Sequence, residues 1–190
     1  MTRAPEREVA VLIREANAND AMAIARVQVD TWRTTYAGLV PAAYLRDLSY
    51  ERQGQVWGDF ISTLRDATGL YVVETAAGAV IGFAHGGPER SHRGDYQGEL
   101  YALYLLAAYQ RQGLGRQLTG AVVKKLRHCG WSSMLVWVLA ANPCRAFYEA
   151  LGGQSVREQD ITIGGARLRE IAYGWSDLRE FAGRIAGQRC

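Results

Sequence analysis

The stretch QRQGLGR at residues 110–116 is the most informative part of the sequence for the fold, because it lies between a strand-like segment and an amphipathic helix. Gly113 and Gly115 let the backbone turn tightly without a clashing Cβ, so several N–H groups can converge on one point. The positive end of the following helix dipole, together with Arg111 and Arg116, adds positive charge at that point. The stretch therefore predicts a phosphate or pyrophosphate site, with a glycine-rich turn that binds no ligand as the alternative.

The segments around this stretch alternate between strand-like and helix-like periodicity. Upstream, ELYALYLLA at 99–107 is apolar for most of its length, which predicts a strand buried on both faces. Downstream, 113–128 has one apolar stripe with its lysines outside, which predicts a helix. Further strands are expected at 9–14, 70–75, 79–86, 133–140, 156–163 and 167–174, and further helices at 21–34, at 42–63 with an interruption at Gly54, and from Asn142 to Gly152. These elements predict one α/β unit.

Composition sets the broad class. The chain of 190 residues is 48% hydrophobic and 22% charged, so one domain is expected over 1–175, followed by a basic tail at 176–190 that could form a short helix. Three scattered cysteines argue against disulfides and metal, and favour a cytoplasmic location. The longest apolar run is too short to span a bilayer, and MTRAPEREVA lacks the core of a secretion signal. A charge of +3 is no polybasic signature, so neither nucleic acid nor membrane is expected as a partner.

The central stretch resembles one known phosphate-binding loop and differs from two others. It lacks the G-K-[ST] ending of a P-loop and the third glycine of a dinucleotide fingerprint. Gln110, Gly113 and Gly115 instead match [RQ]-x-x-G-x-[GA], the acyl-CoA loop of the GNAT superfamily of N-acetyltransferases, and the resemblance covers roughly Val11 to Trp175. It implies acetyl-CoA as cosubstrate and a mixed, mostly antiparallel sheet of about seven strands flanked by about four helices.

A second landmark, NPCRAFYEALGG at 142–153, is similar to the family's pattern N-x-x-A-x-x-F-Y-E-x-L-G. By resemblance, Tyr148 is the candidate general acid for coenzyme A, with packing or pocket lining as the alternative. A phenol with an ordinary pKa of about 10 keeps its proton at neutral pH and can give it to a departing thiolate, whose thiol has a pKa of about 8.5. Cys144 has no histidine beside it in the sequence, so it is interpreted as a small helix residue rather than an acyl-enzyme nucleophile.

The sequence identifies the general base less clearly than the general acid. Glu99 opens the strand before the loop, and relatives use acidic residues of this strand as base; an exposed strand-end carboxylate and a water relay are the alternatives. The glutamate that some relatives carry on the fifth strand is replaced here by Val136, Trp137 and Val138. His85 and His92 are further candidates, although loop histidines are more often simply solvated.

The resemblance also assigns cofactor and acceptor contacts. The backbone of Leu103, Tyr104 and Leu105 would pair with the pantetheine arm, with their side chains as ordinary core. The remaining cofactor residues are Arg111, Gln112, Gly113, Leu114, Gly115, Arg116 and Asn142. The segment 29–45 would lie over the acceptor, where Trp32 and Tyr36 could flank an amine by cation–π contact or, alternatively, anchor the loop on the core.

The distribution of charge agrees with an anionic cofactor. Six cationic and no acidic side chains lie between Leu100 and Tyr148, which leaves the remaining chain mildly acidic and compatible with a cationic amine. The predicted function is direct transfer of an acetyl group from acetyl-CoA to a primary amine in a ternary complex. The acceptor is a small molecule, with a protein N-terminus or lysine as alternative. A non-catalytic acyl-CoA sensor is the competing class, and the oligomeric state stays open, a homodimer included.

Overall fold

A computed structural model describes residues 10–91 and 93–187. Val9, His92 and the last three residues of the expected tail lie outside the described residues. One seven-stranded sheet has the order β1-β2-β3-β4-β5-β7-β6. Its strands are β1 (Val11–Glu15), β2 (Gly69–Thr75), β3 (Val80–Pro88), β4 (Gly98–Leu105), β5 (Met134–Leu139), β6 (Gln154–Ile163) and β7 (Ala166–Trp175). Among the seven strands of the described residues, only β4 and β5 pair in parallel, so the predicted mixed, mostly antiparallel sheet is confirmed.

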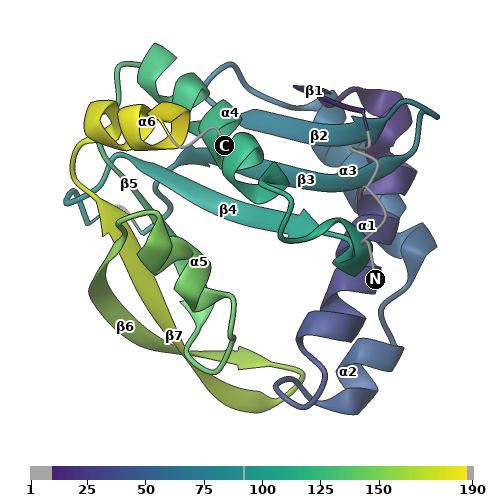
Figure 1. Cartoon of the computed structure of the whole chain (residues 1–190). Coiled ribbons are helices and arrows are strands. Elements are labelled where there is room, and N and C mark those ends of the chain that lie inside the picture. Colours follow the sequence, from purple (N-terminus) through teal and green to yellow (C-terminus); the bar gives the residue numbers. More distant parts are fainter. Residues whose placement is uncertain (1–9, 92, 188–190) are drawn as a thin grey trace, which may run out of the picture.

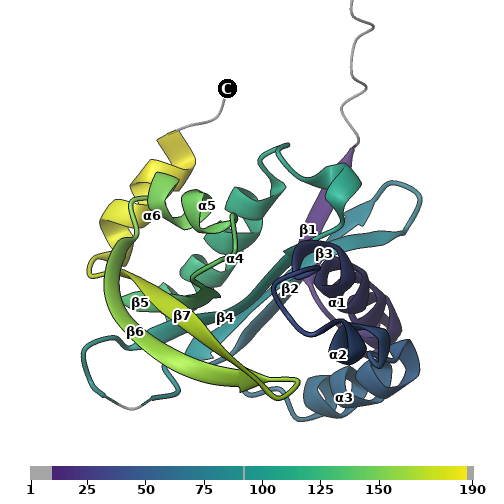
Figure 2. The ribbon, with the colours of Figure 1, turned by 90° about the horizontal axis from the view of Figure 1, so that it is seen from below.

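Helices cover both faces of the sheet (Figure 1). They are α1 (Ala21–Thr35), α2 (Ala42–Arg46), α3 (Tyr50–Ser62), α4 (Leu114–His128), α5 (Arg145–Ala150) and α6 (Leu178–Gly187), with short 3-10 helices at Ala18–Asp20 and Ala107–Tyr109. Figure 2 shows α1, α2 and α3 on one face and α4, α5 and α6 on the other. The larger core lies under α4 and α6, and a second core lies between α1, α3 and the sheet. None of the helices in the described part of the chain is long and apolar enough to cross a bilayer.

The described residues form six α-helices where about four were expected. The expected helix at 42–63 is two helices, because Arg33 donates to the carbonyls of Leu45 and Leu48 at 3.3 and 2.7 Å and so ends α2, while Ser49 caps the start of α3. The expected interruption at Gly54 is wrong: this glycine lies inside α3, where a Cβ would come within 3.0 Å of the Met22 side chain. Close packing of α1 against α3 explains that glycine.

Part of the expected C-terminal tail is an ordered helix. Leu178 and Phe181 of α6 are buried in the larger core, and the ring of Phe181 lies 4.9 Å from that of Trp175. Ile185 faces Gly120 of α4, where a Cβ would lie 3.3 Å from it. Residues 178–187 therefore complete the layer that covers α4.

The feature that positions the site is the divergence of β4 from β5. The two strands pair only over Gly98–Leu100 and Met134–Val136. Directly after Leu100 the register against β3 shifts by one residue at Tyr101, which is a β-bulge and bends the strand. Beyond it β4 is only partly buried, so the expectation of a strand buried on both faces holds for its first three residues and is wrong for the rest. The departure of β5 leaves the far edge of β4 unpaired.

The hairpin of β6 and β7 reaches back across this divergence to α2 (Figures 1 and 2). A Cβ on Gly164, at the turn, would lie 2.7 Å from the Cβ of Tyr44 in α2. A third apolar cluster joins Val40 and Leu45 to Leu139, with side chains of the hairpin packed against it. The two halves of the sheet are thus bridged at the open end.

Candidate active site

The loop before α4 has the backbone expected of an anion site. Arg111 and Gly113 have positive φ values of 64° and 80°, which turn the chain sharply into the helix. The first helical bond runs from the N–H of Gln117 to the carbonyl of Gly113 at 3.1 Å, so the N–H groups of the first turn have no partner within the helix. These donors and the helix dipole make this end of α4 attractive to a phosphate.

Side chains of the loop play unequal parts. Gln110 donates to the carbonyl of Leu105 at 3.0 Å and so ties the loop to the end of β4. Gln112 is exposed and donates to the carbonyl of Ala108 at 3.1 Å, whereas Leu114 is buried in the core. Gln110 was not among the predicted site residues. Its place as the first residue of the acyl-CoA loop motif could have identified it.

Tyr148 stands on α5 close to the diverging strands. Its side chain is buried, its ring stacks on Tyr173 at 6.3 Å, and Tyr173 donates to Glu149 at 2.6 Å, which ties α5 to β7. Burial raises the pKa of the Tyr148 phenol well above its ordinary value, and the neighbouring Tyr104 and Cys144 raise it further. Tyr148 therefore keeps its proton at neutral pH, as a general acid must before it acts.

The structure brings α5 and the anion loop together. Arg111 lowers the pKa of the Cys144 thiol against the dominant effect of burial, so the arginine lies near the start of α5. A Cβ on Gly115 would lie 3.5 Å from the ring of Phe147. Asn142 is buried and accepts from the N–H of Cys144 at 2.9 Å, which caps the turn ahead of α5. The predicted acid and the predicted phosphate loop are neighbours in space.

Glu99 occupies the other end of β4, where the strand is still paired with β5. Its side chain is 2% exposed, so the alternative of an exposed strand-end carboxylate is wrong. Its Oε2 accepts from the backbone N–H of Arg90 at 3.1 Å, and its Oε1 accepts from Nε and Nη2 of the same arginine. The guanidinium in turn lies 4.5 Å from the centre of the Tyr101 ring. Both carboxylate oxygens are therefore engaged.

Trp32 and Tyr36 meet Tyr104 of β4. The indole N–H of Trp32 donates to the Tyr104 hydroxyl at 3.0 Å, and the rings of Trp32 and Tyr36 are 4.8 Å apart. Burial raises the pKa of Tyr36, and so do Tyr104 and Tyr148, which places three phenols in one neighbourhood. The side chain at 104 packs against the second core, as expected, and its hydroxyl in addition accepts a hydrogen bond.

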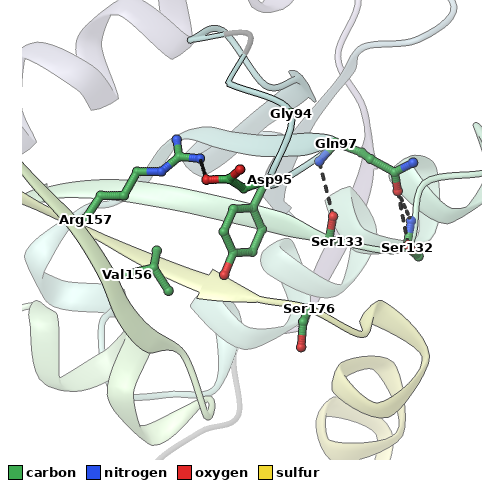
Figure 3. Close-up of a pocket in the computed structure, with 9 residues that line it drawn as sticks. Gly94, Asp95, Gln97, Ser132, Ser133, Val156, Arg157 and Ser176 are labelled. Carbon is green, nitrogen blue, oxygen red and sulfur yellow. Dashed lines mark hydrogen bonds and ion pairs between the residues drawn. The ribbon is translucent and has the colours of Figure 1, made fainter.

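A cavity of about 530 Å³ lies away from these residues (Figure 3). Its walls come from the loop before β4, the two residues before β5, β6 and the residue after β7; they are Gly94, Asp95, Tyr96, Gln97, Ser132, Ser133, Val156, Arg157 and Ser176. Its polar groups largely satisfy one another: Arg157 pairs with Asp95 at 2.6 Å, and Gln97 bonds to Ser132 and Ser133, the two residues that precede β5. The cavity contains none of the predicted site residues, and its contacts anchor the loop that carries Arg90.

The sheet splits between β4 and β5, and the N-terminus of α4, which begins after Gly113, lies beside the split. This arrangement is that of the class of N-acetyltransferases. The chain belongs to the GNAT superfamily. Residues 90–161 match the family described as FR47-like protein. The chain is 44% identical over 168 residues to the uncharacterized N-acetyltransferase YuaI of Bacillus subtilis (strain 168), a match that covers 88% of this chain and 94% of that protein.

Solved structures share the fold at lower identity. The PaiA N-acetyltransferase of Thermoplasma acidophilum, in complex with coenzyme A, has a TM-score of 0.64 at 22% identity, over 85% of this chain and 98% of that one. YncA of Salmonella typhimurium, described as a putative acetyltransferase with its cofactor acetyl-CoA, has a TM-score of 0.66 at 21% identity, over 88% and 94%. The fold is that of a GNAT acetyltransferase.

Proposed function

We propose that the protein transfers an acetyl group directly from acetyl-CoA to a primary amine, both substrates being bound together. The observation that carries the proposal is the neighbourhood of buried Tyr148, the α4 N-terminus and the unpaired edge of β4. A proton donor for a thiolate, an anion site and a strand edge that β5 has left are what the thioester, pyrophosphate and pantetheine parts of acetyl-CoA require. The crystal structures with coenzyme A and acetyl-CoA share this fold, which supports the choice of cosubstrate.

The residues present fit this cosubstrate. The first-turn N–H groups of α4, with Arg111 and Arg116, would hold the pyrophosphate. The backbone of Leu103–Leu105 would pair with the amide groups of the pantetheine arm, because β5 has left that edge. Gln110 and Asn142 hold the loop and the start of α5 in place through their own hydrogen bonds. Acetyl-CoA supplies the thioester carbonyl; the chain supplies position and protons.

Two residues handle protons in the proposal. Tyr148 gives its phenolic proton to the departing thiolate. Glu99 receives the proton of the attacking amine through water, because Arg90 already bonds to both carboxylate oxygens and the carboxylate lies before the bulge rather than in the split. The alternative is that water alone accepts the proton of the amine. In that case Glu99 would affect the rate only by holding Arg90 in position.

The hairpin favours a small acceptor over a polypeptide. An extended peptide needs an open groove, and here the turn at Gly164 packs against Tyr44 across the open end of the sheet. Val40 and Leu45 pack with side chains of the same hairpin. The acceptor amine would reach the thioester beside Trp32 and Tyr36, where cation–π contact favours a cation before it is deprotonated. A cytoplasmic location and a homodimer stay predictions.

The proposal is tested by release of free thiol from acetyl-CoA, with the full chain, against polyamines, amino acids, aminoglycosides and lysine-containing peptides. The expected result is turnover with at least one small amine, a matching acetylated product by mass spectrometry, and little turnover with peptides of the same charge. The Tyr148→Phe variant in the same screen separates catalysis from uncatalysed acetylation. Binding of acetyl-CoA without thiol release for any amine would overturn the proposal, and turnover confined to peptides would overturn the choice of acceptor.

A further inference from the structure

One carboxylate of the β6–β7 hairpin has no basic partner. On one face of the hairpin, two acidic side chains of β6 form ion pairs of 2.5 to 2.9 Å with two arginines of β7; they are Glu158 and Asp160 with Arg167 and Arg169. Glu170 of β7 differs from them, because Gln159 donates to its Oε1 at 2.6 Å through a neutral amide. Of the described residues, no lysine or arginine forms an ion pair with Glu170. Its carboxylate is therefore held in place without being paired to a cation.

Glu170 faces the side of the sheet on which α1 and α2 lie. Ile171, the next residue of β7, packs against the larger core under α4 and α6. Leu168, two residues before Glu170, belongs to the other face, where it packs in the third apolar cluster together with Trp32 and Tyr36. Because side chains alternate along a strand, Glu170 shares the face of Leu168. The carboxylate thus lies beside the cluster that contains the two predicted acceptor residues.

Trp137 of β5 lies next to this carboxylate. Its two chain neighbours face the larger core, so its indole lies on the same face of the sheet as Glu170. In the register of β5 and β7, Trp137 opposes Ala172 and Leu139 opposes Glu170. Trp137 and Glu170 are therefore diagonal neighbours, roughly 7–8 Å apart and within reach of long side chains. Trp137 is also the residue of β5 that is not fully buried, and within 10–91 and 93–187 no hydrogen bond or aromatic contact involves its indole.

The arginines in this part of the fold are engaged by other carboxylates. Arg90 donates to Glu99 through Nε and Nη2, and Arg157 of β6 pairs with Asp95 at 2.6 Å. The hydrogen bond to Glu99 raises the pKa of Arg90 most, and Glu170 adds a smaller rise without pairing with it. Glu99 and Glu170 together outweigh the single charge of Arg90. One negative charge is therefore left beside a partly exposed indole, which favours a cation from the acceptor.

We propose that Glu170 and Trp137 select an acceptor with a second cationic group, that is, a diamine or a longer polyamine. One amine attacks the thioester, and the other stays protonated, bonded to the Glu170 carboxylate against the face of the indole. Leu139 and Leu168, which flank Glu170 on this face, suit the methylene chain that joins the two amines. The same carboxylate disfavours an acceptor whose far end is an anion. This inference rests on the proposed function.

The test compares two series of acceptors with the full chain and saturating acetyl-CoA. The first series is the α,ω-diaminoalkanes from putrescine to diaminooctane, and the second is the amino alcohols of the same lengths. A hydroxyl in place of the second amine removes its charge and keeps the chain. At the best length, we expect kcat/KM to be about tenfold higher for the diamine, which is the scale of one charge-assisted hydrogen bond. The difference should lie mainly in KM, because the second amine is remote from the reacting atoms.

Variants of the hairpin and of β5 assign the preference to these two residues. Glu170→Gln keeps the shape of the side chain and should abolish most of the preference for the diamine, whereas Trp137→Leu should reduce it by a smaller factor. Glu158→Gln is the matched control, because it removes a carboxylate of the same hairpin from the opposite face, where Arg169 is its partner. It should leave the preference unchanged. Each variant is judged by the ratio of two substrates, so a partial loss of folded protein does not alter the result.

The outcomes separate this inference from the proposed function. Absence of turnover with every amine, diamines included, overturns the proposed function and this inference with it. Turnover at equal kcat/KM for diamines and amino alcohols overturns this inference alone, and so does a preference for diamines that survives Glu170→Gln. An equal loss for both acceptors in Glu170→Gln also overturns it, because Glu170 would then support the fold rather than bind the second amine.

Discussion

The two ends of β4 differ in what their side chains meet, although they belong to one strand of eight residues. At the start, Glu99 is buried, paired with Arg90 and adjacent to β5. At the end, Tyr104 is partly exposed and bonded to Trp32, with no neighbouring strand on the β5 side. The bulge at Tyr101 separates the two environments. We call them the paired end and the split end of β4.

One irregularity, the bulge, gives the two ends of β4 different surroundings. Pairing with β5 satisfies the backbone at the paired end and leaves its side chains to satisfy one another. The bulge bends β4 away, so backbone groups at the split end are available to a ligand. Chemistry is therefore expected to be concentrated at the split end, with the paired end supporting it through Glu99.

Tyr148→Phe should have the largest effect and gives the most direct test of the split end. Removing the phenol proton while keeping the ring should lower kcat on the order of 10²- to 10³-fold. The affinity for acetyl-CoA, measured by calorimetry, should change little, because the stacking on Tyr173 remains. A loss of acetyl-CoA affinity as large as the loss of kcat would mean that Tyr148 binds the cosubstrate. The split end of β4 would then not be distinguished from the paired end by its chemistry.

Glu99→Gln tests whether the paired end takes part in the chemistry. If the carboxylate receives the amine proton through water, kcat at neutral pH should fall by about one to two orders of magnitude, and the deficit should shrink as pH rises. The control is Glu89→Gln, which alters another buried carboxylate of the same region, 4.0 Å from Arg157. It should lower stability and leave the pH dependence of kcat intact. Equal pH profiles for both variants would assign Glu99 to holding Arg90 alone.

Much of the fold was predictable from local pattern. The apolar runs at 70–75 and 133–140 and the turn at Gly164 correspond to β2, β5 and the hairpin end, because each is set by neighbours in the chain. The break between α2 and α3 was not predictable, since Arg33 causes it from a different helix. The burial of Leu178 and Phe181 likewise depends on the surface of α4, which no pattern in residues 176–190 reveals.

The site residues also fall into those that local sequence predicts and those set by long-range contacts. Gly113, Gly115 and Tyr148 stand at fixed motif spacings, so a resemblance is enough to select them as candidates. The burial of Glu99 is a long-range result, because the loop that returns Arg90 to it is fixed by Ser133, just before β5, and by Arg157 of β6. The hydrogen bond of the Tyr104 hydroxyl could not be predicted, because the neighbours of Tyr104 in sequence are apolar and its partner Trp32 lies 72 positions away.

Gly113→Ala tests the anion loop at the split end. Its φ of 80° strains any residue with a Cβ by about 1–2 kcal/mol, although no atom lies within 4 Å of the added carbon. The loop should relax away from this conformation, so the Kd for acetyl-CoA should rise about five- to tenfold. Gly130→Ala is a matched control at the other end of α4, with φ of 81° and the same open surroundings. It should cost similar stability in urea and leave the Kd unchanged; equal Kd values for both variants would contradict a phosphate site at the loop.

His85, which pairs with Ala102 just past the bulge, should show the smallest effect, and it tests whether the surroundings of the bulge are dry. Its ring lies 4.6 Å from Phe60 and 4.7 Å from Tyr101, and burial, followed by the charge of Arg90, lowers its pKa to about 4 from the ordinary 6.5. The unfolded chain binds this proton more tightly than the folded protein does. Stability from this group is therefore present above pH 6.5 and is lost as pH falls towards 4.

Between pH 8 and pH 6 this linkage amounts to at most about 0.8 kcal/mol in the free energy of unfolding, or roughly a fourfold change in the equilibrium. The measurement is urea unfolding of the wild type and His85→Asn at both pH values, with the other histidines present in each. The variant should lose less stability than the wild type on going to pH 6. An equal loss would mean that water reaches the imidazole, and the surroundings of the bulge between β3 and β4 would then not be dry.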